Sequence, residues 1–332
     1  MVDLAQRLVP RRTAVTGGVS APVLLGLVAA AAFLVIGSLA SDIFAQQTVA
    51  GLAQGAIFAS LALALVLIYR ATEVINFAQG EMAMATTYVA YQLTLWGLSY
   101  WAAFFLTLPI AFVIGFVLQV LVIRPVQHSV IAVVIVTVGL FILIDGIVTW
   151  IWGADLKFMK APFGTTVYHA GGVAFARQDI GVLAVSILSV IALWALFRFT
   201  KLGLGMRAAA LRPAAASLVG VRVRWMLAIG WGLAAMLGAV SGLMTEPTQF
   251  LQPTMMQPIL LYAFAAAVLG GLESPAGAVV AGLALGVFLN LTGQYVSFAT
   301  SELRLPLAFL VLLVVLLLKP TGLFGRKQVR RV

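Results

Sequence analysis

The stretch 46–81 decides the fold of this chain. An apolar run over 46–69 ends at Arg70, and the chain then reads Val74-Ile75-Asn76-Phe77-Ala78-Gln79-Gly80-Glu81. Two amides and a carboxylate therefore lie within six residues, at the start of a second apolar run over 76–95. Polar groups within membrane helices are costly and usually face a bundle interior or a water-filled path. Asn76, Gln79 and Glu81 are therefore candidates for lining a substrate path.

A structural interpretation of the same residues is also open. In it, Asn76 and Gln79 cap the following helix, and Glu81 complements the positive end of its dipole. Gly80 would then permit close backbone approach or a break in the helix just before the carboxylate.

Composition sets the class of protein. Of 332 residues, 63% are hydrophobic and 9% are charged, and the mean hydropathy is +1.12. A soluble chain carries about 25% charged residues. Repeated apolar runs of about 20 residues predict an all-α polytopic membrane protein. The chain has no cysteine, which excludes disulfides and thiolate metal sites.

The apolar runs predict about ten transmembrane helices. They cover 21–40, 46–69, 76–95, 102–123, 131–152, 180–199, 226–245, 259–272, 276–296 and 305–318. The runs 259–272 and 305–318 are short for a full crossing. Arg11 and Arg12 before the first run also resemble an export signal, but the run is longer than a usual signal core. We therefore expect a cytoplasmic segment over 1–20, an extra N-terminal transmembrane helix over 21–45, a main transmembrane domain over 46–325 and a basic cytoplasmic tail over 326–332.

The distribution of basic residues predicts the orientation. If the N-terminus is cytoplasmic and every run crosses, sixteen of the 20 lysines and arginines lie inside. The four outside are Lys157, Lys160, Arg177 and Arg304. By the positive-inside rule both termini lie in the cytoplasm, with a long outer loop over 153–179 and a long inner loop over 198–224. The net charge of +10 thus indicates membrane orientation and no nucleic-acid partner.

The inner loop is expected to hold a helix. It contains six basic residues and no acidic one, and 206–218 is rich in alanine and leucine. Pro213 would break this helix or start a second piece. A helix here suggests a docking surface for a partner.

Acidic residues elsewhere are scattered singly. Asp145 lies in the second half of the run 131–152 and is a further substrate-path candidate, although a hydrogen bond between helices would explain it equally well. Glu246 is expected to open an outer loop before Pro247, and Glu273 with Ser274 to cap the next helix.

Enzyme motifs are missing from the sequence. None of the five lysines follows glycine, which excludes a P-loop, and neither G-x-S-x-G nor H-E-x-x-H occurs. His128 and His169 fall on opposite sides of the predicted membrane. We expect a chain that is not an enzyme, holds no cofactor and binds no metal.

Small residues hint at internal symmetry. The stretch 51–61 resembles 232–243, and the two would run in opposite directions, as in an inverted repeat. Glycines spaced four apart (51 and 55, 238 and 242, 282 and 286) would let helices approach closely.

Several spaced stretches resemble the LivH-type permeases of ABC importers for branched-chain amino acids. They are 75–81, Arg124-Pro125-Val126, 203–220, 266–271 with 275–277, and 319–325. The family usually has histidine where Gln79 stands, and acidic residues where this chain has Leu211-Arg212-Pro213-Ala214. The second difference implies a differently charged ATPase partner.

The resemblance implies a type II ABC importer-like permease in the cytoplasmic (inner) membrane. It implies a second homologous permease subunit, two subunits that bind ATP and magnesium, an extracytoplasmic solute-binding protein and surrounding lipid as partners. The loop 203–220 would couple ATP hydrolysis to transport, with the candidate residues Arg207, Leu211, Arg212, Leu218, Val219 and Gly220. The solute would be a small amino acid, with branched-chain ones leading, or a related amide such as urea.

Two other functions remain open at this point. An ion-coupled secondary transporter would use Asp145 and Glu81 and would work alone. A membrane-embedded enzyme acting on lipid would need a catalytic cluster, which the sequence does not display.

Overall fold

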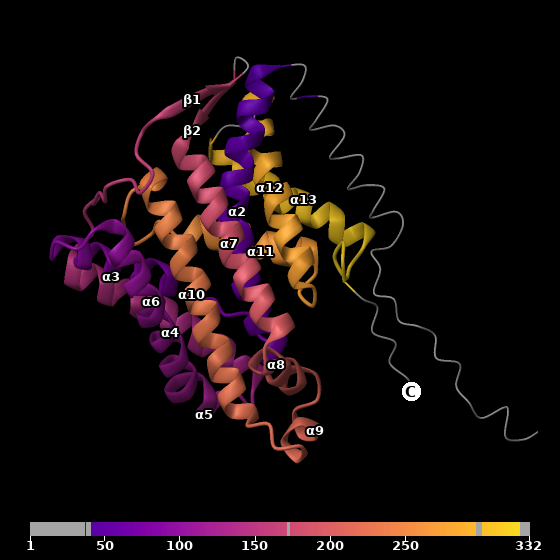
Figure 1. The fold of residues 1–332 in the computed structure, drawn as a ribbon. Coiled ribbons are helices and arrows are strands. Elements are labelled where there is room, and N and C mark those ends of the chain that lie inside the picture. The colour runs from indigo at the N-terminus through magenta and orange to yellow at the C-terminus, as the bar shows by residue number, and fades with distance from the viewer. Residues whose placement is uncertain (1–36, 38–40, 171–172, 297–300, 326–332) are drawn as a thin grey trace, which may run out of the picture.

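A computed structural model describes residues 37, 41–170, 173–296 and 301–325, which form a bundle of helices (Figure 1). The elements are, in chain order, α2 (Asp42–Thr72), α3 (Gln79–Leu95), α4 (Tyr100–Leu118), the π-helical η1 (Gln119–Ile123), α5 (Arg124–Val126), α6 (Val130–Trp152), β1 (Val167–Ala170), β2 (Val173–Ala176), α7 (Arg177–Phe199), α8 (Lys201–Leu211), α9 (Pro213–Leu218), α10 (Val223–Gln249), α11 (Gln257–Gly270), α12 (Pro275–Tyr295), the 3-10 helix η2 (Ser301–Leu303) and α13 (Arg304–Leu318).

Every predicted apolar run from 46–69 onward coincides with a helix. Within the described residues, six helical stretches are long and apolar enough to cross a membrane: α2, 100–126, α6, α7, α10 and α12. Helices α11 and α13 are short, as predicted, with 14 and 15 residues. The predicted segment 1–20, nearly all of the extra helix 21–45 and the tail 326–332 lie outside the described residues. Ten crossings and the inverted repeat therefore stay predictions.

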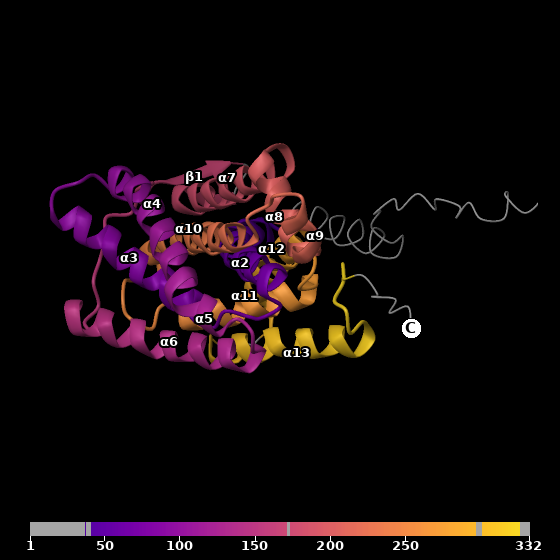
Figure 2. The same cartoon turned by 90° about the horizontal axis from the view of Figure 1, so that it is seen from below.

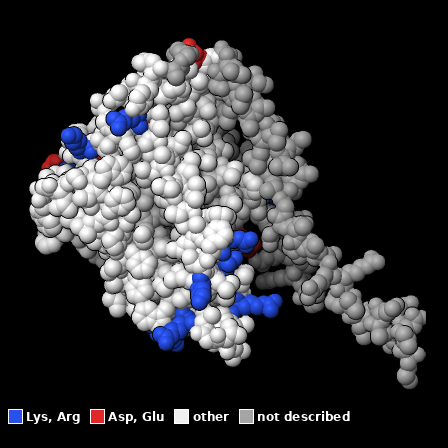
Figure 3. Space-filling model, in the orientation of Figure 1, with Lys and Arg blue, Asp and Glu red and all other residues white. Residues whose placement is uncertain are grey.

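Helices α2 and α10 form the centre of the bundle. In their most apolar stretches 89% and 78% of residues are buried, against 17% in α6. Seen from below, α7 and the hairpin cover one flank, while α6 and α13 lie along the opposite one (Figure 2). The outer helices present apolar side chains outward because lipid, and not water, is their solvent. In Figure 3, lysines and arginines gather at the lower end, where Figure 1 places α8 and α9, and the middle of this face is almost uncharged.

Glycine pairs set the tightest helix contacts, as predicted. Gly51 and Gly55 of α2 pack on Gly282 and Gly286 of α12, with backbone against backbone. A Cβ at Gly55 would lie 2.8 Å from the Cα of Leu283, closer than side chains are found in proteins. Only glycine permits this approach of two antiparallel helices.

The pair Gly238 and Gly242 likewise allows α10 to approach α3 closely. A Cβ at Gly242 would lie 2.8 Å from the carbonyl oxygen of Ala83, and one at Gly238 would lie 2.9 Å from the Gln79 amide. Gly80 on α3 approaches Leu260 of α11 from the other side. Helix α3 is therefore held closely between α10 and α11.

The segment 153–179, predicted to be an outer loop, corrects the all-α prediction. It contains an antiparallel hairpin in which Val167 pairs with Ala176 and Tyr168 with Phe175. Valine, tyrosine and phenylalanine favour strands, and nothing in a hydropathy count registers such a short pair.

Glu246 ties this outer segment to the bundle, and its predicted position was wrong. It does not open a loop: α10 continues to Gln249, and Glu246 is buried. Its Oε1 accepts a hydrogen bond of 2.7 Å from the backbone N–H of Met159. Lys157 and Leu251 also exchange backbone hydrogen bonds of 2.9 and 3.0 Å. Pro247 does not stop the helix here, since a proline within a membrane helix is tolerated where neighbours satisfy the backbone.

Two helices occupy the inner segment. The helix predicted over 206–218 begins earlier, at Lys201, because the Thr200 hydroxyl accepts a hydrogen bond of 3.0 Å from the Gly203 N–H and caps it. It ends at Leu211, and Pro213 is the first residue of α9. Proline lacks the N–H that would continue the first helix, so the predicted break at Pro213 is confirmed.

Candidate functional site

The connection between α2 and α3 is built from buried amides. Helix α2 ends at Thr72, and Glu73 follows in the left-handed conformation with φ of 57°. The Asn76 Oδ1 accepts a hydrogen bond of 3.1 Å from the Ala78 N–H, and the Asn76 Nδ2 donates one of 3.2 Å to the Gln79 Oε1. Asn76 thus closes a turn just before α3 and does not cap the helix, whose N-cap is Ala78 without a side-chain hydrogen bond.

Gln79 reaches across to α10. Its Nε2 donates a hydrogen bond of 2.9 Å to the carbonyl oxygen of Ala234. Both ends of this buried amide are thus satisfied, one by Asn76 and the other by α10. A satisfied buried amide stabilises and orients the elements that it joins. Asn76 and Gln79 fasten the start of α3 to the centre of the bundle.

Glu81 faces another side of α3 and is not satisfied in this way. The side chain is fully buried, and no donor among the described residues has full hydrogen-bond geometry to either carboxylate oxygen, while the Gln257 amide interacts with it as a weak donor. Asp145 on α6 is its neighbour in electrostatic range, and Gln257 at the first turn of α11 lies beside it. Burial of a carboxylate with so few donors costs free energy. Its place in the first turn of α3, at the positive end of the helix dipole, offsets part of this cost.

Tyr88 joins Glu81 and was missed from the sequence. It follows Glu81 by seven residues, which places both on one face of α3. Its side chain is fully buried, its hydroxyl has no partner within the described part of the chain, and Asp145 is an electrostatic neighbour. Spacing in α3 is the signal that could have found it.

Trp152 closes the outer side of this group. Its ring centroid lies 5.3 Å from that of Tyr88, and its Nε1 donates a hydrogen bond of 2.9 Å to the Gln92 Oε1. Asp145 is half-buried, and its Oδ1 is enclosed without a described partner. Glu81, Tyr88 and Asp145, which we call the acidic cluster, thus offer oxygen acceptors and one hydroxyl between α3 and α6.

The chemistry of the acidic cluster favours a group with several N–H donors. Carboxylates accept hydrogen bonds and an ammonium group donates three of them. The structure thus divides the four sequence candidates into two pairs. Asn76 and Gln79 form hydrogen bonds that hold the start of α3 in place, whereas Glu81 and Asp145 belong to the acidic cluster.

The inner helices hold the other predicted residues. Met206, Ala209 and Ala216 are buried and anchor α8 and α9 to the bundle. Three of the six candidates for coupling to the ATPase are large apolar residues with exposed side chains, namely Leu211, Leu218 and Val219. Leu218 is 88% exposed. Arg212 and Gly220 are exposed as well, and Arg207 is half-buried.

A metal centre is not formed by the residues that the structure describes, since no three His, Asp or Glu side chains gather there. An apolar bundle with membrane-length helices, unsatisfied polar groups inside and an exposed helical pair at one end is typical of a multi-pass membrane transport protein.

Comparison with known proteins identifies the family. Residues 47–318 match the family described as "Branched-chain amino acid transport system / permease component". The chain belongs to this family and is a LivH-type permease. Permease components of ABC importers work with ATPase and substrate-binding subunits, and they are not themselves enzymes.

Individual relatives agree. The high-affinity branched-chain amino acid transport system permease protein LivH of Salmonella typhimurium is 29% identical over 87% of this chain and 98% of its own length. A probable LivH of Methanocaldococcus jannaschii is 30% identical over 80% of this chain and 87% of its own. BraD of Pseudomonas aeruginosa is 27% identical over 87% and 98%. Among solved structures, PsaBC from Streptococcus pneumoniae in complex with Fab is similar over 87% of this chain and 96% of that chain, with a TM-score of 0.46 and 11% identity.

Proposed function

We propose that this chain is the membrane permease subunit of an ATP-driven ABC importer for a small amino acid, with the branched-chain amino acids as the leading class. The observation that carries the proposal is the family match over 47–318, which spans the whole helical bundle from α2 to α13. The relatives named above are branched-chain amino acid permeases.

We propose that the acidic cluster is a polar binding site on the substrate path. Every amino acid carries an α-ammonium group, and Glu81 with Asp145 would accept its hydrogen bonds during passage between α3 and α6. Tyr88 would add a further acceptor. This use explains why the bundle keeps a buried carboxylate with so few donors of its own. It leaves the amino-acid side chain to the apolar surroundings, as a branched-chain substrate requires.

Coupling to ATP hydrolysis is proposed to run through α8 and α9. Leu211, Leu218 and Val219 are exposed at the charged end of the bundle, where no lipid would cover them. Such residues would fill a groove on an ATPase subunit, while Arg207 and Arg212 would meet acidic residues at its rim. Gly220, with φ of 85°, would permit the sharp turn that returns the chain to α10.

The proposed assembly contains this chain, a second homologous permease, two subunits that bind ATP and magnesium, and a solute-binding protein outside. The chain would lie in the cytoplasmic membrane with both termini inside. The secondary-transporter alternative is not favoured, because the relatives are permeases of ABC systems.

Reconstitution tests the function. The chain is co-expressed with the products of its neighbouring genes, purified and placed in vesicles with the solute-binding protein. We expect uptake of labelled leucine that needs ATP and competes with isoleucine and valine, but not with urea. Uptake by the chain alone, driven by an ion gradient without ATP, would refute the proposal.

A further inference from the structure

A second site lies at the lower end of the bundle, between α2, α7 and α12. Here a groove of about 410 Å³ is lined by apolar side chains from all three helices. Its lining includes Leu63, Leu67, Val190, Phe197, Val279 and Val280. The volume lies in the range of ligand-binding clefts, about 300–1,000 Å³.

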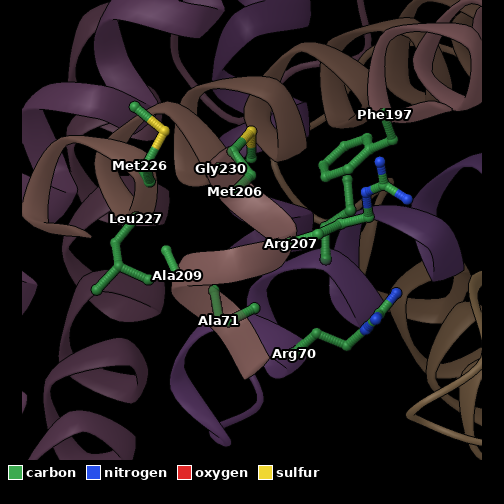
Figure 4. A pocket seen from close by; sticks show the side chains of 11 residues that line it. Arg70, Ala71, Phe197, Met206, Arg207, Ala209, Met226, Leu227 and Gly230 are labelled. Carbon is green, nitrogen blue, oxygen red and sulfur yellow. The ribbon is translucent and has the colours of Figure 1, made fainter. Parts of the chain in front are cut away.

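Three arginines from three different helices border this groove. Arg70 comes from the last turn of α2, Arg198 from the last turn of α7 and Arg207 from α8. A smaller cleft beside it shares Arg70, Phe197 and Arg207, and in Figure 4 both guanidinium groups extend to the same side of that cleft. Arg70 has an interaction partner within the described residues, so Arg198 and Arg207 are the two guanidinium groups of this groove that an anion would pair with.

The N-terminus of α12 adds positive potential at the end of the groove that the arginines border. Pro275 and Ala276 line the groove, and the positive end of the α12 dipole lies at these residues. The Ser274 hydroxyl caps the helix by accepting a hydrogen bond of 3.1 Å from the Gly277 N–H. Glu273 precedes the helix and already has an interaction partner within the described residues.

One wall of the groove opens outward toward the bilayer. Ile191 and Trp194 line it from α7 and are 52% and 58% exposed. A ligand can therefore enter sideways from the membrane, with its apolar part against α7 and α12 and its charged part at the arginines. Tryptophan at the height of lipid headgroups is typical of membrane boundaries.

We propose that this groove binds an anionic phospholipid of the inner leaflet. One acyl chain would lie between α7 and α12, and the phosphate would contact Arg198, Arg207 and the α12 N-terminus. The proposal rests on the predicted orientation, which places this end of the bundle in the cytoplasm. A small soluble anion does not fit equally well, because most of the lining is apolar. Since Arg207 lies on α8, bound lipid would also contact the helix proposed to face the ATPase.

The test measures bound lipid and not transport. The full chain, purified with its co-expressed partners, is placed in nanodiscs that contain equal amounts of phosphatidylglycerol and phosphatidylcholine with identical acyl chains. Native mass spectrometry then counts the lipids that each complex retains. We expect preferential retention of phosphatidylglycerol. Arg198→Gln should lower it roughly fivefold, and Arg198→Gln combined with Arg207→Gln roughly thirtyfold.

The matched control is Arg222→Gln with Arg224→Gln. Both residues are exposed near the same end of the bundle, and neither lines the groove. This control removes two positive charges, as many as the double variant of Arg198 and Arg207. This control should retain phosphatidylglycerol as the unmodified protein does. A second variant, Val280→Trp, fills the groove and should lower retention while all arginines stay in place.

Three results would overturn the proposal. One is equal loss of phosphatidylglycerol in the groove variants and in the control. Another is equal retention of the two lipids by the unmodified protein. The third is a photo-crosslinking residue at Val280 that couples to protein, either the N-terminal segment or a second subunit, and not to lipid.

Discussion

Glu81 of α3 and Asp145 of α6 are electrostatic neighbours inside the bundle, and each has an enclosed carboxylate oxygen that no donor in the described structure meets with full hydrogen-bond geometry. Two residues away, Gln79 has a partner at both ends of its amide. Under the proposed function Glu81 serves transport and Gln79 serves the fold, which leads to opposite expectations for the two positions.

Glu81→Gln should impair uptake and leave the protein stable. A hydrogen bond to a charged group contributes about 1.5–3 kcal/mol, so leucine uptake should fall roughly tenfold to a hundredfold. Removing an unsatisfied buried charge should keep thermal stability equal or raise it. Uptake in vesicles and the melting temperature of the purified complex provide the two measurements. Normal uptake would remove Glu81 from the substrate path.

Gln79→Leu should show the reverse order of effects. It removes the buried hydrogen bonds that the Gln79 amide makes with the Ala234 carbonyl and the Asn76 amide, and an amide lost in this way costs about 1–3 kcal/mol. We expect a lower melting temperature and a lower protein level. Uptake per folded complex should change little. A variant as stable as the unmodified protein would show that these hydrogen bonds do not fasten α3.

The orientation can be tested with two single cysteines, since the chain has none of its own. Thr165 lies in the outer segment and Ser217 on α9, and both side chains are exposed. In intact cells an impermeant thiol reagent should label Thr165→Cys and not Ser217→Cys. After the cells are opened, both should react. The opposite pattern in intact cells would invert the proposed topology.

Leu218→Asp should uncouple transport from ATP hydrolysis. Its side chain is 88% exposed, so the variant should fold and insert normally. If Leu218 fills an ATPase groove, a buried carboxylate there costs several kcal/mol, and loaded binding protein should no longer stimulate hydrolysis. His128→Asp is the control, because it adds a carboxylate to another exposed turn at the predicted inner side. Equal stimulation in both variants would show that α9 does not carry the coupling.

Gly286→Leu should disrupt the contact between α2 and α12. Any Cβ at Gly286 would overlap the backbone of Gly55, and the helices must separate to admit it. Overpacking of this kind costs about 1–3 kcal/mol or more. Gly139→Leu on α6 is the matched control, because Gly139 is exposed and a Cβ there meets no neighbouring atom. The melting temperature should fall for the first variant only; equal values would argue against tight packing at this crossing.

The sequence alone determined the class of protein and the positions of the helices. Every apolar run that the structure describes became a helix, because backbone polar groups in lipid must be satisfied within the segment itself. The break at Pro213 was equally predictable, since proline lacks the N–H that continues a helix. Spaced family stretches pointed to the LivH-type permeases, which the match over 47–318 confirms.

Tertiary structure decided what the polar residues do. Gln79 and Glu81 are two residues apart, which turns them about 200° from each other around α3, and only packing determines what each one meets. Hydropathy does not reveal that α10 accepts the Gln79 amide, or that α6 brings Asp145 to the face of α3 that carries Glu81 and Tyr88. In the same way, Arg70, Arg198 and Arg207 are far apart in the chain and share one groove only because the last turns of α2 and α7 lie beside α8. Local sequence determines where a helix forms, but contacts between distant segments depend on how the side chains of the whole bundle fit together.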